Sequence, residues 1–274
     1  MLDIQNLSKT FNPGTVNEKK ALSSLSLHLD EGDFVTIVGS NGAGKSTLFN
    51  AIAGSFYADE GSISLAGKDI TFMPEHERSR RIGRLFQDPL RGTAPSMTIE
   101  ENLALAYLRA AHGNPFSRIS KKDKDFFAEQ LKQLDMGLED RMKNPVGLLS
   151  GGQRQRCWIA MALAQQTATI LLDEPTTWLD LRYQVDILEL LQTLTREHGR
   201  TVVTVLHDLN FAVNYADLLV FLKQGRIAGT ISDNDVCSPE LIKRVFDVDV
   251  QMSINPQTGK PFFMPFRARQ AAAQ

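Results

Sequence analysis

Polar and apolar residues alternate near the start of the chain. Residues 24–29 read Ser-Leu-Ser-Leu-His-Leu, and a period of two is typical of a strand with one buried face. With the segments at residues 2–4 and 62–65, this pattern predicts an antiparallel sheet. His28 falls on the polar face of its strand, so we expect it to be solvated rather than functional.

Unbroken apolar runs follow further along the chain. Runs this short are typical of strands that are buried on both faces of a parallel sheet. A further pair of segments, Leu218–Leu222 and Arg226–Ala228, flanks a turn-like Lys-Gln-Gly and predicts a hairpin. The predicted strands of this kind are Phe34–Val38, Ile170–Leu172 and Thr201–Leu206, and a further short strand is predicted at Ile82–Phe86.

The period of amphipathic helices appears in several other segments. Thr98 followed by Glu101 predicts a capping box at a helix start, and residues 121–134 carry an apolar stripe beside a charged face. Because no strand pattern interrupts residues 90–150, we expect this part to be a helical insertion. Further helices are predicted at Leu48–Ala53, Leu149–Gln165, Leu181–Arg196 and Ser238–Phe246.

Composition limits the possible classes of protein. The chain has 274 residues, 42% of them hydrophobic, which is enough for a full α/β core with an inserted subdomain. A formal net charge of −2 argues against bulk nucleic-acid binding, which usually requires a basic excess. Cys157 and Cys237 lack metal-like spacing and suit a reducing compartment. No signal peptide or membrane-spanning run is visible, so a membrane role would need a partner.

The stretch between the first buried strand and the first helix carries the strongest motif. It fits the P-loop pattern G-x-x-x-x-G-K-[ST] in the required strand–loop–helix context. Its glycines let backbone N–H groups cradle phosphate oxygens, and the helix N-terminus adds partial positive charge. Lys45 is expected to reach the β- and γ-phosphates, and the Ser46 hydroxyl to bind Mg²⁺. The predicted nucleotide-binding residues are Gly39, Ser40, Asn41, Gly42, Ala43, Gly44, Lys45, Ser46 and Thr47.

Two adjacent carboxylates, Asp173 and Glu174, follow the buried strand predicted at residues 170–172. We expect this strand to lie beside the P-loop strand in a parallel sheet, where ligands gather at the carboxyl ends of the strands. Asp173 is expected to hold Mg²⁺, mostly through water. Glu174 is expected to point at the γ-phosphate and polarise water. The pair alone is a weak signal, and its position among the other motifs strengthens it.

The order of the motifs resembles one known family. Leu-Ser-Gly-Gly-Gln at 149–153 stands between the P-loop and Asp-Glu-Pro-Thr at 173–176. Over residues 1 to about 225 the chain resembles the ATP-binding cassette family, the ATPase subunits of ABC transporters. The resemblance implies an α/β fold with a P-loop NTPase (RecA-like) parallel-sheet core, an antiparallel β subdomain and an inserted helical subdomain. It places an ABC nucleotide-binding domain at 1–225 and a small C-terminal extension at 226–274.

The resemblance also implies roles for single residues. Phe11 falls at the place of an adenine-stacking aromatic, although the residues alone leave simple packing equally open. Gln87 resembles a glutamine that contacts Mg²⁺ and senses the membrane partner. Asp180 resembles the aspartate of a loop linking two nucleotide sites, and His207 resembles a switch histidine that hydrogen-bonds the γ-phosphate. Ser150, Gly151, Gly152 and Gln153 resemble the signature loop, which contacts ATP held on another subunit. The implied catalytic residues are Lys45, Gln87, Glu174 and His207.

The function implied by the resemblance is ATP hydrolysis with Mg²⁺ that drives a membrane importer. One cassette per chain implies a homodimer that sandwiches ATP. The implied partners are an integral membrane permease and a solute-binding protein, and the implied location is the cytoplasmic face of the cell membrane, reached through the permease. The alternative is a soluble ABC-type ATPase without a transport partner. An exporter ATPase is disfavoured, and no nucleic-acid partner is expected.

The two halves resemble different subfamilies. Residues 1 to about 150 resemble ATPases of an amino-acid-type importer, the sort linked to aromatic amino acid uptake. Residues from about 157 onward resemble ferric-siderophore importer ATPases, on motifs such as Thr-Thr-Trp-Leu-Asp at 176–180. The hypothesis is a mosaic or chimera that crosses over at 149–156, in which the front half selects the permease. It leaves an amino acid or a ferric siderophore as the transported substrate.

Overall fold

A six-stranded sheet in the order β10-β9-β3-β8-β7-β6 lies at the centre of the molecule. The computed structural model describes residues 1–85, 92–110, 119–134, 137–177, 179–232, 235 and 237–266. Only β10 runs antiparallel to its neighbour within this sheet. The strands are β3 (Phe34–Gly39), β6 (Ile82–Leu85), β7 (Thr169–Asp173), β8 (Thr201–Val205), β9 (Leu218–Lys223) and β10 (Arg226–Ser232).

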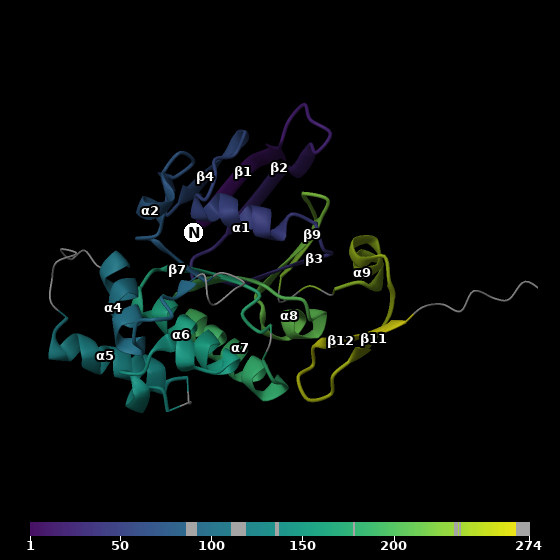
Figure 1. Cartoon of the computed structure of the whole chain (residues 1–274). Helices are drawn as coiled ribbons and strands as arrows, with labels where there is room; N and C mark the ends of the chain where they lie inside the picture. The colour runs from purple at the N-terminus through teal and green to yellow at the C-terminus, as the bar shows by residue number, and fades with distance from the viewer. Residues whose placement is uncertain are drawn as a thin grey trace, which may run out of the picture.

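The predictions of buried strands and of the hairpin are confirmed. Every residue of β3, β7 and β8 is buried, because both faces of the sheet are covered (Figure 1). Phe34 and Val38 pack into the cluster on the side of α6 and α7, whereas Val35 and Ile37 pack into the cluster on the side of α1. The covering helices are α1 (Lys45–Ala53), α6 (Gly151–Ala164), α7 (Leu181–Arg196) and α8 (Leu209–Tyr215).

One expectation about strand order is wrong. The strand that ends in Asp173 does not lie beside the P-loop strand, because β8 lies between β3 and β7 and pairs with both. Crossover connections in a parallel sheet can skip a position, so the order along the chain does not fix the order in space. The carboxyl ends of β3, β8 and β7 still meet at one edge of the sheet.

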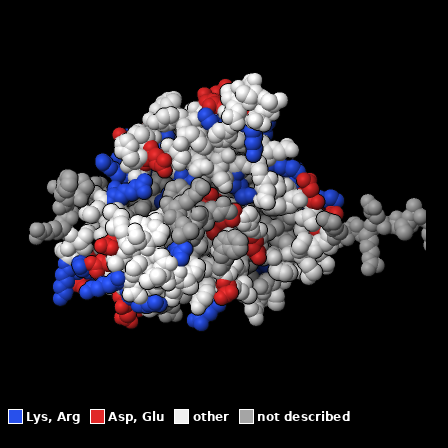
Figure 2. All heavy atoms as spheres, viewed as in Figure 1, with Lys and Arg blue, Asp and Glu red and all other residues white. Residues whose placement is uncertain are grey.

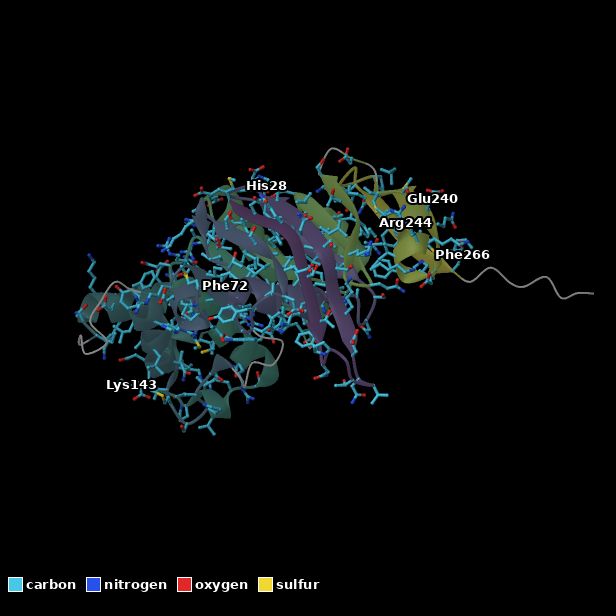
Figure 3. The ribbon with its side chains drawn as sticks, turned by 90° about the horizontal axis from the view of Figure 1, so that it is seen from above. His28, Phe72, Lys143, Glu240, Arg244 and Phe266 are labelled. Atoms are coloured by element: carbon cyan, nitrogen blue, oxygen red, sulfur yellow. The ribbon has the colours of Figure 1, made fainter. Side chains whose placement is uncertain are left out.

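The predicted antiparallel sheet is confirmed, in the order β2-β1-β4-β5. Leu25, Leu27 and Leu29 are buried and the alternate residues are exposed, which is the pattern of a sheet with one solvated face. His28 belongs to the exposed face, as predicted, and lies at the outer surface of the sheet (Figure 3). The strands are β1 (Leu2–Phe11), β2 (Lys19–Leu29), β4 (Glu60–Leu65) and β5 (Lys68–Asp69).

The described residues between 92 and 150 form helices and turns without a strand, and one isolated bridge joins Thr98 to Pro145. The capping box at Thr98 and Glu101 is confirmed by reciprocal hydrogen bonds. A second box, Ser120 with Asp123, begins α5. Lys and Arg mix with Asp and Glu over α5 (Figure 2), so the charge run there is a solvated face. The elements are α4 (Ile99–Ala110), α5 (Lys121–Lys132) and short 3₁₀ turns at Glu139–Arg141 and Val146–Leu148; the small helix α2 (Glu75–Arg78) precedes this region.

Arg156 joins three of the helices. Its side chain is 2% exposed, and its guanidinium donates to the carbonyl oxygen of Leu134 and to Asp186 Oδ2, the latter at 3.2 Å. The same group lies 4.3 Å from the centre of the Tyr183 ring. Arg156, on α6, therefore ties the end of α5 to α7.

The C-terminal part of the chain packs against the central sheet. Helix α9 (Pro239–Phe246), capped by Ser238, is followed by the hairpin of β11 (Asp249–Ile254) and β12 (Pro261–Phe266). The boundary expected after residue 225 falls in the turn of the β9–β10 hairpin, and β10 is an edge strand of the central sheet. Within the described part of the chain, none of the helices has the length and apolar character that a membrane crossing requires.

Candidate functional site

The loop between β3 and α1 is shaped by two glycines. A Cβ on Gly39 would lie 2.3 Å from the carbonyl oxygen of Leu222, so only glycine fits beside β9. Gly44, which precedes α1, has a φ of +109°, and a Cβ there would lie 2.8 Å from the carbonyl oxygen of Ala21. The first N–H groups of α1 have no partner within their helix. They face the loop and form a site that suits phosphate oxygens.

Lys45, the first residue of α1, is held inside this loop. It is 7% exposed, and its ammonium group donates to the carbonyl oxygens of Gly39 at 2.7 Å and Ser40 at 3.1 Å. Burial lowers the pKa of Lys45, and the charges of Glu174 and Asp173 act against that change. The two carboxylates therefore act electrostatically on the Lys45 ammonium group.

Asp173 ends β7 with one carboxylate oxygen unsatisfied. The residue is 7% exposed, and its Oδ1 atom has no hydrogen-bond partner among the described residues. Burial raises the pKa of Asp173 and Glu174 adds to the rise, while Arg84, Lys45 and a hydrogen bond from Ser46 oppose it. A buried carboxylate next to a hydroxyl offers oxygen ligands to a hard cation.

This donor set fits Mg²⁺ only in combination with a substrate. Among the described residues there is no group of three His, Cys, Asp or Glu side chains placed to hold a metal ion. Mg²⁺ is commonly bound through one or two carboxylates together with substrate phosphates. The unsatisfied Oδ1 of Asp173 and the neighbouring Ser46 hydroxyl match that pattern.

Glu174 and His207 meet above the end of the sheet. The Nε2 atom of His207, which follows β8, lies 2.6 Å from Glu174 Oε1. On the other side, the Thr177 hydroxyl donates to Glu174 Oε2 at 3.3 Å. Glu174 has a φ of +55°, a left-handed conformation that is uncommon for a residue other than glycine. It thus turns sharply out of β7, and its side chain is 12% exposed against 51% for His207.

The glycine-rich segment at 150–153 begins α6. The Ser150 hydroxyl accepts from the N–H of Gln153, and the Gln153 side chain accepts from the N–H of Ser150. Nothing lies within 4 Å of a Cβ placed on Gly151, so the helix N-terminus is open. No hydrogen bond or ion pair among the described residues joins Ser150 to the loop at 39–47. The segment is thus presented outward rather than to its own P-loop.

The remaining expected residues are placed as follows. Asp180 is the N-cap residue of α7 and makes no side-chain capping bond, while Gln184 donates to the carbonyl oxygens of Thr176 and Leu179 and holds the preceding loop. Phe11 ends β1 and packs edge-on against Phe56, with ring centres 5.3 Å apart. That contact is the packing role which the sequence left open beside base stacking. Gln87 lies outside the described residues.

Arg84 was not identified from the sequence. Its guanidinium group donates a hydrogen bond to the side-chain oxygen of Asn50 on α1. Its positive charge acts to lower the pKa of Asp173. Burial lowers its pKa, opposed by Glu75 and Asp173. The available signal was an arginine inside an apolar strand, Ile-Gly-Arg-Leu at 82–85, because a cation in such a strand usually has a partner.

Comparison with known proteins gives a family and close relatives. The family model described as "ABC transporter" matches residues 22–177. The chain is 39% identical over 242 residues to the ferric enterobactin transport ATP-binding protein FepC of Escherichia coli (strain K12), covering 88% of this chain and 87% of that protein. It is 36% identical over 250 residues to the iron(3+)-hydroxamate import ATP-binding protein FhuC of Bacillus subtilis (strain 168), covering 91% and 90%.

Solved structures agree with this assignment. A dimeric ATP-binding cassette in a post-hydrolysis state with ADP and Pi superimposes with a TM-score of 0.77 and 31% identity, covering 86% of this chain and all of that one. A putative metal-chelate type ABC transporter in an inward-facing conformation superimposes with a TM-score of 0.76 and 26% identity, covering 97% of both chains. The predicted fold class is confirmed by both likenesses.

The expected division into two subfamilies is not supported. The siderophore-importer relatives match through the front half as well as the back half. A tyrosine transport ATP-binding protein of Clostridioides difficile (strain R20291) is 36% identical over 236 residues, covering 86% of this chain and 93% of that protein. Relatives of both kinds therefore share the whole cassette with this chain, because the fold and the phosphate-binding motifs are common to both. A crossover at residues 149–156 is not needed.

Proposed function

Because the chain belongs to the ABC transporter family of ATP-binding cassettes, we propose that it is the ATP-hydrolysing, energy-coupling subunit of an importer for ferric siderophores. The observation that carries the proposal is the convergence at one sheet edge. The P-loop with Lys45, the unsatisfied carboxylate of Asp173 and the Glu174–His207 pair come from the ends of β3, β7 and β8. Phosphoryl transfer requires a cation, a carboxylate that can hold a metal ion and a base at one place. Here these three groups come from separate segments of the chain.

The P-loop would bind the phosphates of ATP through backbone N–H groups and Lys45. Lys45 would exchange its bonds to the carbonyl oxygens of Gly39 and Ser40 for bonds to phosphate oxygens. In the new bonds both the donor and the acceptor would be charged, which favours the exchange. Phe11 is proposed to border the adenine, and its edge-on contact with Phe56 would hold the ring in place.

Glu174 is the proposed general base. Its carboxylate would accept a proton from the attacking water, and His207 at 2.6 Å would fix the direction of the carboxylate and contact the γ-phosphate. General-base catalysis of this kind contributes about 10²–10⁴-fold in rate. The Thr177 hydroxyl bond to the other carboxylate oxygen limits rotation of the group.

Ser46 and Asp173 would hold Mg²⁺, with Gln87 as a further proposed ligand. Bound there, Mg²⁺ supplies charge neutralisation on the phosphate oxygens. The chain's own contribution is to keep one oxygen of Asp173 free of other partners and the Ser46 hydroxyl next to it.

Two copies of the chain would be needed for one complete site. The open N-terminus of α6 at Ser150–Gln153 is presented outward, so it is available to the phosphates of ATP on a second copy. Asp180, at the start of α7, is proposed to link the two sites. The dimeric state of the related cassette with ADP and Pi supports this arrangement.

The proposed substrate class follows from the relatives' names. FepC and FhuC transport ferric enterobactin and iron(3+)-hydroxamate, and the structural relative that spans 97% of this chain is of the metal-chelate type. The implied partners are a membrane permease and a solute-binding protein, and the chain would be held at the cytoplasmic face of the membrane by its permease. Residues 1–225 are proposed as the catalytic domain and 226–274 as its extension.

Uptake by cells that lack the gene tests this proposal. Loss of the gene should abolish accumulation of iron-55 supplied as a ferric siderophore and leave tyrosine uptake unchanged, and a plasmid copy should restore it. A plasmid copy carrying Glu174→Gln should fail to restore it. Unchanged iron uptake with lost tyrosine uptake would overturn the substrate class. Unchanged uptake of both would favour an ATPase without a transport partner.

A further inference from the structure

One cavity of the described structure lies away from the nucleotide site. It has a volume of about 550 Å³ and lies where β7 and β8 begin, at Thr169 and Thr201, beside the turn that links β4 to β5. Asp173 and His207 lie at the opposite, carboxyl ends of these two strands. Four residue steps of roughly 3.3 Å put Thr169 about 13 Å from Asp173. The nucleotide machinery therefore does not account for the cavity.

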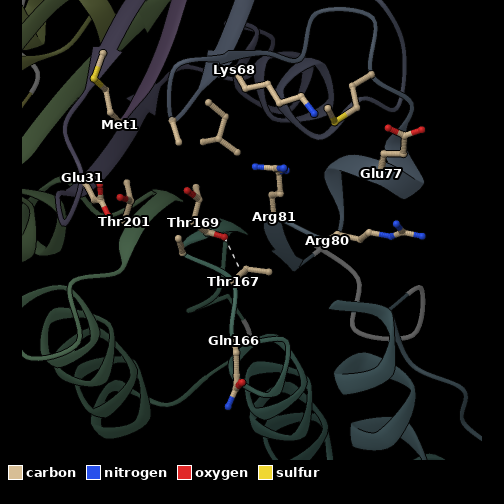
Figure 4. A pocket seen from close by; sticks show the side chains of 14 residues that line it. Met1, Glu31, Lys68, Glu77, Arg80, Arg81, Gln166, Thr167, Thr169 and Thr201 are labelled. Carbon is tan, nitrogen blue, oxygen red and sulfur yellow. Dashed lines mark hydrogen bonds between the residues drawn. The ribbon is translucent and has the colours of Figure 1, made fainter. Parts of the chain in front are cut away.

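Positive side chains from different elements reach this cavity. Lys68 comes from β5, whereas Arg80 and Arg81 come from the turn between α2 and β6. None of the three forms an ion pair within the part of the chain that the structure describes. Glu31 and Glu77 also line the cavity, so the lining has an excess of one positive charge. Figure 4 shows the Arg81 guanidinium pointing into the space below Lys68.

The floor of the cavity carries two threonine hydroxyl groups that can donate hydrogen bonds. Thr169 is 3% exposed, and its hydroxyl makes no hydrogen bond within the described residues, while its carbonyl oxygen accepts from the Thr167 hydroxyl. The Thr201 hydroxyl accepts from the N–H of Gly32 at 3.0 Å, which leaves its own proton to donate. Figure 4 shows Thr169, Thr201 and Arg81 around the same space. A threonine hydroxyl can donate one hydrogen bond, so both groups are available to a ligand with an acceptor oxygen.

The walls of the cavity are apolar. They are formed by Met1, Leu65, Ala66, Met73 and Ala168. A volume of this size lies in the range of small-molecule sites, which combine apolar walls with a few convergent polar groups. The exposed cations and the hydroxyl donors suit a ligand group with negative charge, and the apolar walls suit a carbon body.

We propose that this cavity is a second ligand site, separate from the nucleotide site, for a small organic anion that carries a phosphate or carboxylate group. Arg81 and Lys68 bind the charged group from above, and the hydroxyls of Thr169 and Thr201 donate to it from below. The apolar body packs against Met73 and Leu65. Phosphate and carboxylate oxygens accept the same bonds, and the two head groups are distinguished by the choice of probe.

The test uses the full chain labelled with ¹³C-methyl methionine, because Met73 lines the cavity. Phenyl phosphate and benzoate share a ring and differ in the charged group, and inorganic phosphate tests the charge without a ring. We expect the Met73 methyl signal to shift and saturate with at least one of the two ring compounds, and the Met161 signal on α6 to remain unchanged. Inorganic phosphate should bind more weakly than phenyl phosphate, because it lacks the apolar body.

Variants separate this site from other anion sites. Arg81→Glu should weaken binding about tenfold, which is about 1.4 kcal/mol, and Thr169→Val should weaken it several-fold. The matched control Arg141→Glu changes an exposed arginine outside the cavity and should have no effect, and Lys45→Ala should leave the Met73 shift intact. No Met73 shift at about 10 mM of either ring compound, a concentration that detects Kd values near 1 mM, would overturn the proposal. Equal affinity in the Arg81 and Arg141 variants would also overturn it.

Discussion

The Nε2 atom of His207 lies 2.6 Å from the Oε1 atom of Glu174. The two residues follow the adjacent strands β8 and β7, so a single contact joins the ends of two parallel strands. Glu174 also bends sharply out of its strand at a φ of +55°. The contact holds the proposed base in one direction, and this gives His207 a role that activity measurements can detect.

Replacing His207 with alanine should lower ATP turnover about 100-fold, because the Glu174 carboxylate loses its orienting partner and the γ-phosphate loses a donor. ATP binding, measured by equilibrium dialysis, should change by less than about threefold, since the P-loop is untouched. The matched control is His28→Ala. His28 has the same side-chain exposure, 51%, but lies on the outer sheet, and its loss should leave turnover unchanged. Equal activity in the two variants would remove the proposed role of His207.

Lys45→Ala should abolish both binding and turnover. Lys45 is the buried cation of the P-loop, and no other described residue of the loop carries a positive charge. We expect ATPase activity at least about 100-fold below that of the parent. Lys122→Ala, on the exposed face of α5, serves as the control. Activity within about twofold of the parent, roughly 0.4 kcal/mol in the barrier, would refute the P-loop assignment.

Asp173→Asn should stabilise the nucleotide-free protein while it impairs function. Burial raises the pKa of Asp173 in the folded state, so the folded chain holds this proton more tightly than the unfolded chain does. The contribution of Asp173 to stability is therefore lost as the pH rises through its folded-state pKa. At neutral pH the ionised, partly unsatisfied carboxylate lowers the free energy of unfolding, and asparagine removes this effect.

Thermal unfolding at several pH values checks this prediction. The variant should melt about 2–4 °C above the parent at pH 7, as expected for about 1 kcal/mol. The difference should shrink as the pH falls toward about 4, where the parent carboxyl becomes protonated. Added Mg²⁺ and ATP should raise the melting temperature of the parent more than that of the variant. A variant less stable than the parent at pH 7 would contradict the assigned cause of the pKa shift.

Arg156→Ala should destabilise the chain by about 2–4 kcal/mol, because it removes buried hydrogen bonds and the stacking on Tyr183 together. Arg182→Ala removes the other cation near Asp186. The Arg182 side chain is 76% exposed, and its Nε atom lies 4.0 Å from Asp186 Oδ2. That loss should cost less than about 0.5 kcal/mol. Urea unfolding of the two variants gives the comparison. Similar losses would mean that Arg156 does not tie α5 to α7.

Local pattern was enough to predict most elements of the fold. The burial of β3, β7 and β8, the capping box at Thr98 and the length of α7 depend on residues close in sequence. The P-loop geometry belongs to this group as well, because Gly39 and Gly44 are needed by their immediate surroundings. The position of β8 between β3 and β7 was not predicted, since strand order depends on crossovers between distant segments.

The same limit applies to the site. Asp173 and Glu174 follow an apolar run and His207 was identified through the family resemblance, but the distances between the three residues depend on which strands are neighbours. The burial of Arg156 has no local signal in the sequence, because it results from the packing of three helices. The cavity lined by Lys68, Arg81 and Thr169 left no local pattern, because its lining residues range from Met1 to Thr201 along the chain.

Glu174 is proposed to act as the base of a site that a second copy of the chain completes. The most direct test is size-exclusion chromatography with light scattering on Glu174→Gln in the presence and absence of ATP. Glutamine keeps the shape of the side chain and removes the base, so the variant should bind ATP and hydrolyse it at least about 100-fold more slowly than the parent. We predict that it elutes as a dimer with ATP and as a monomer without nucleotide. A variant that binds ATP but remains monomeric would refute the site shared between two copies. A variant that hydrolyses ATP at the parent's rate would refute the role of Glu174 as the base.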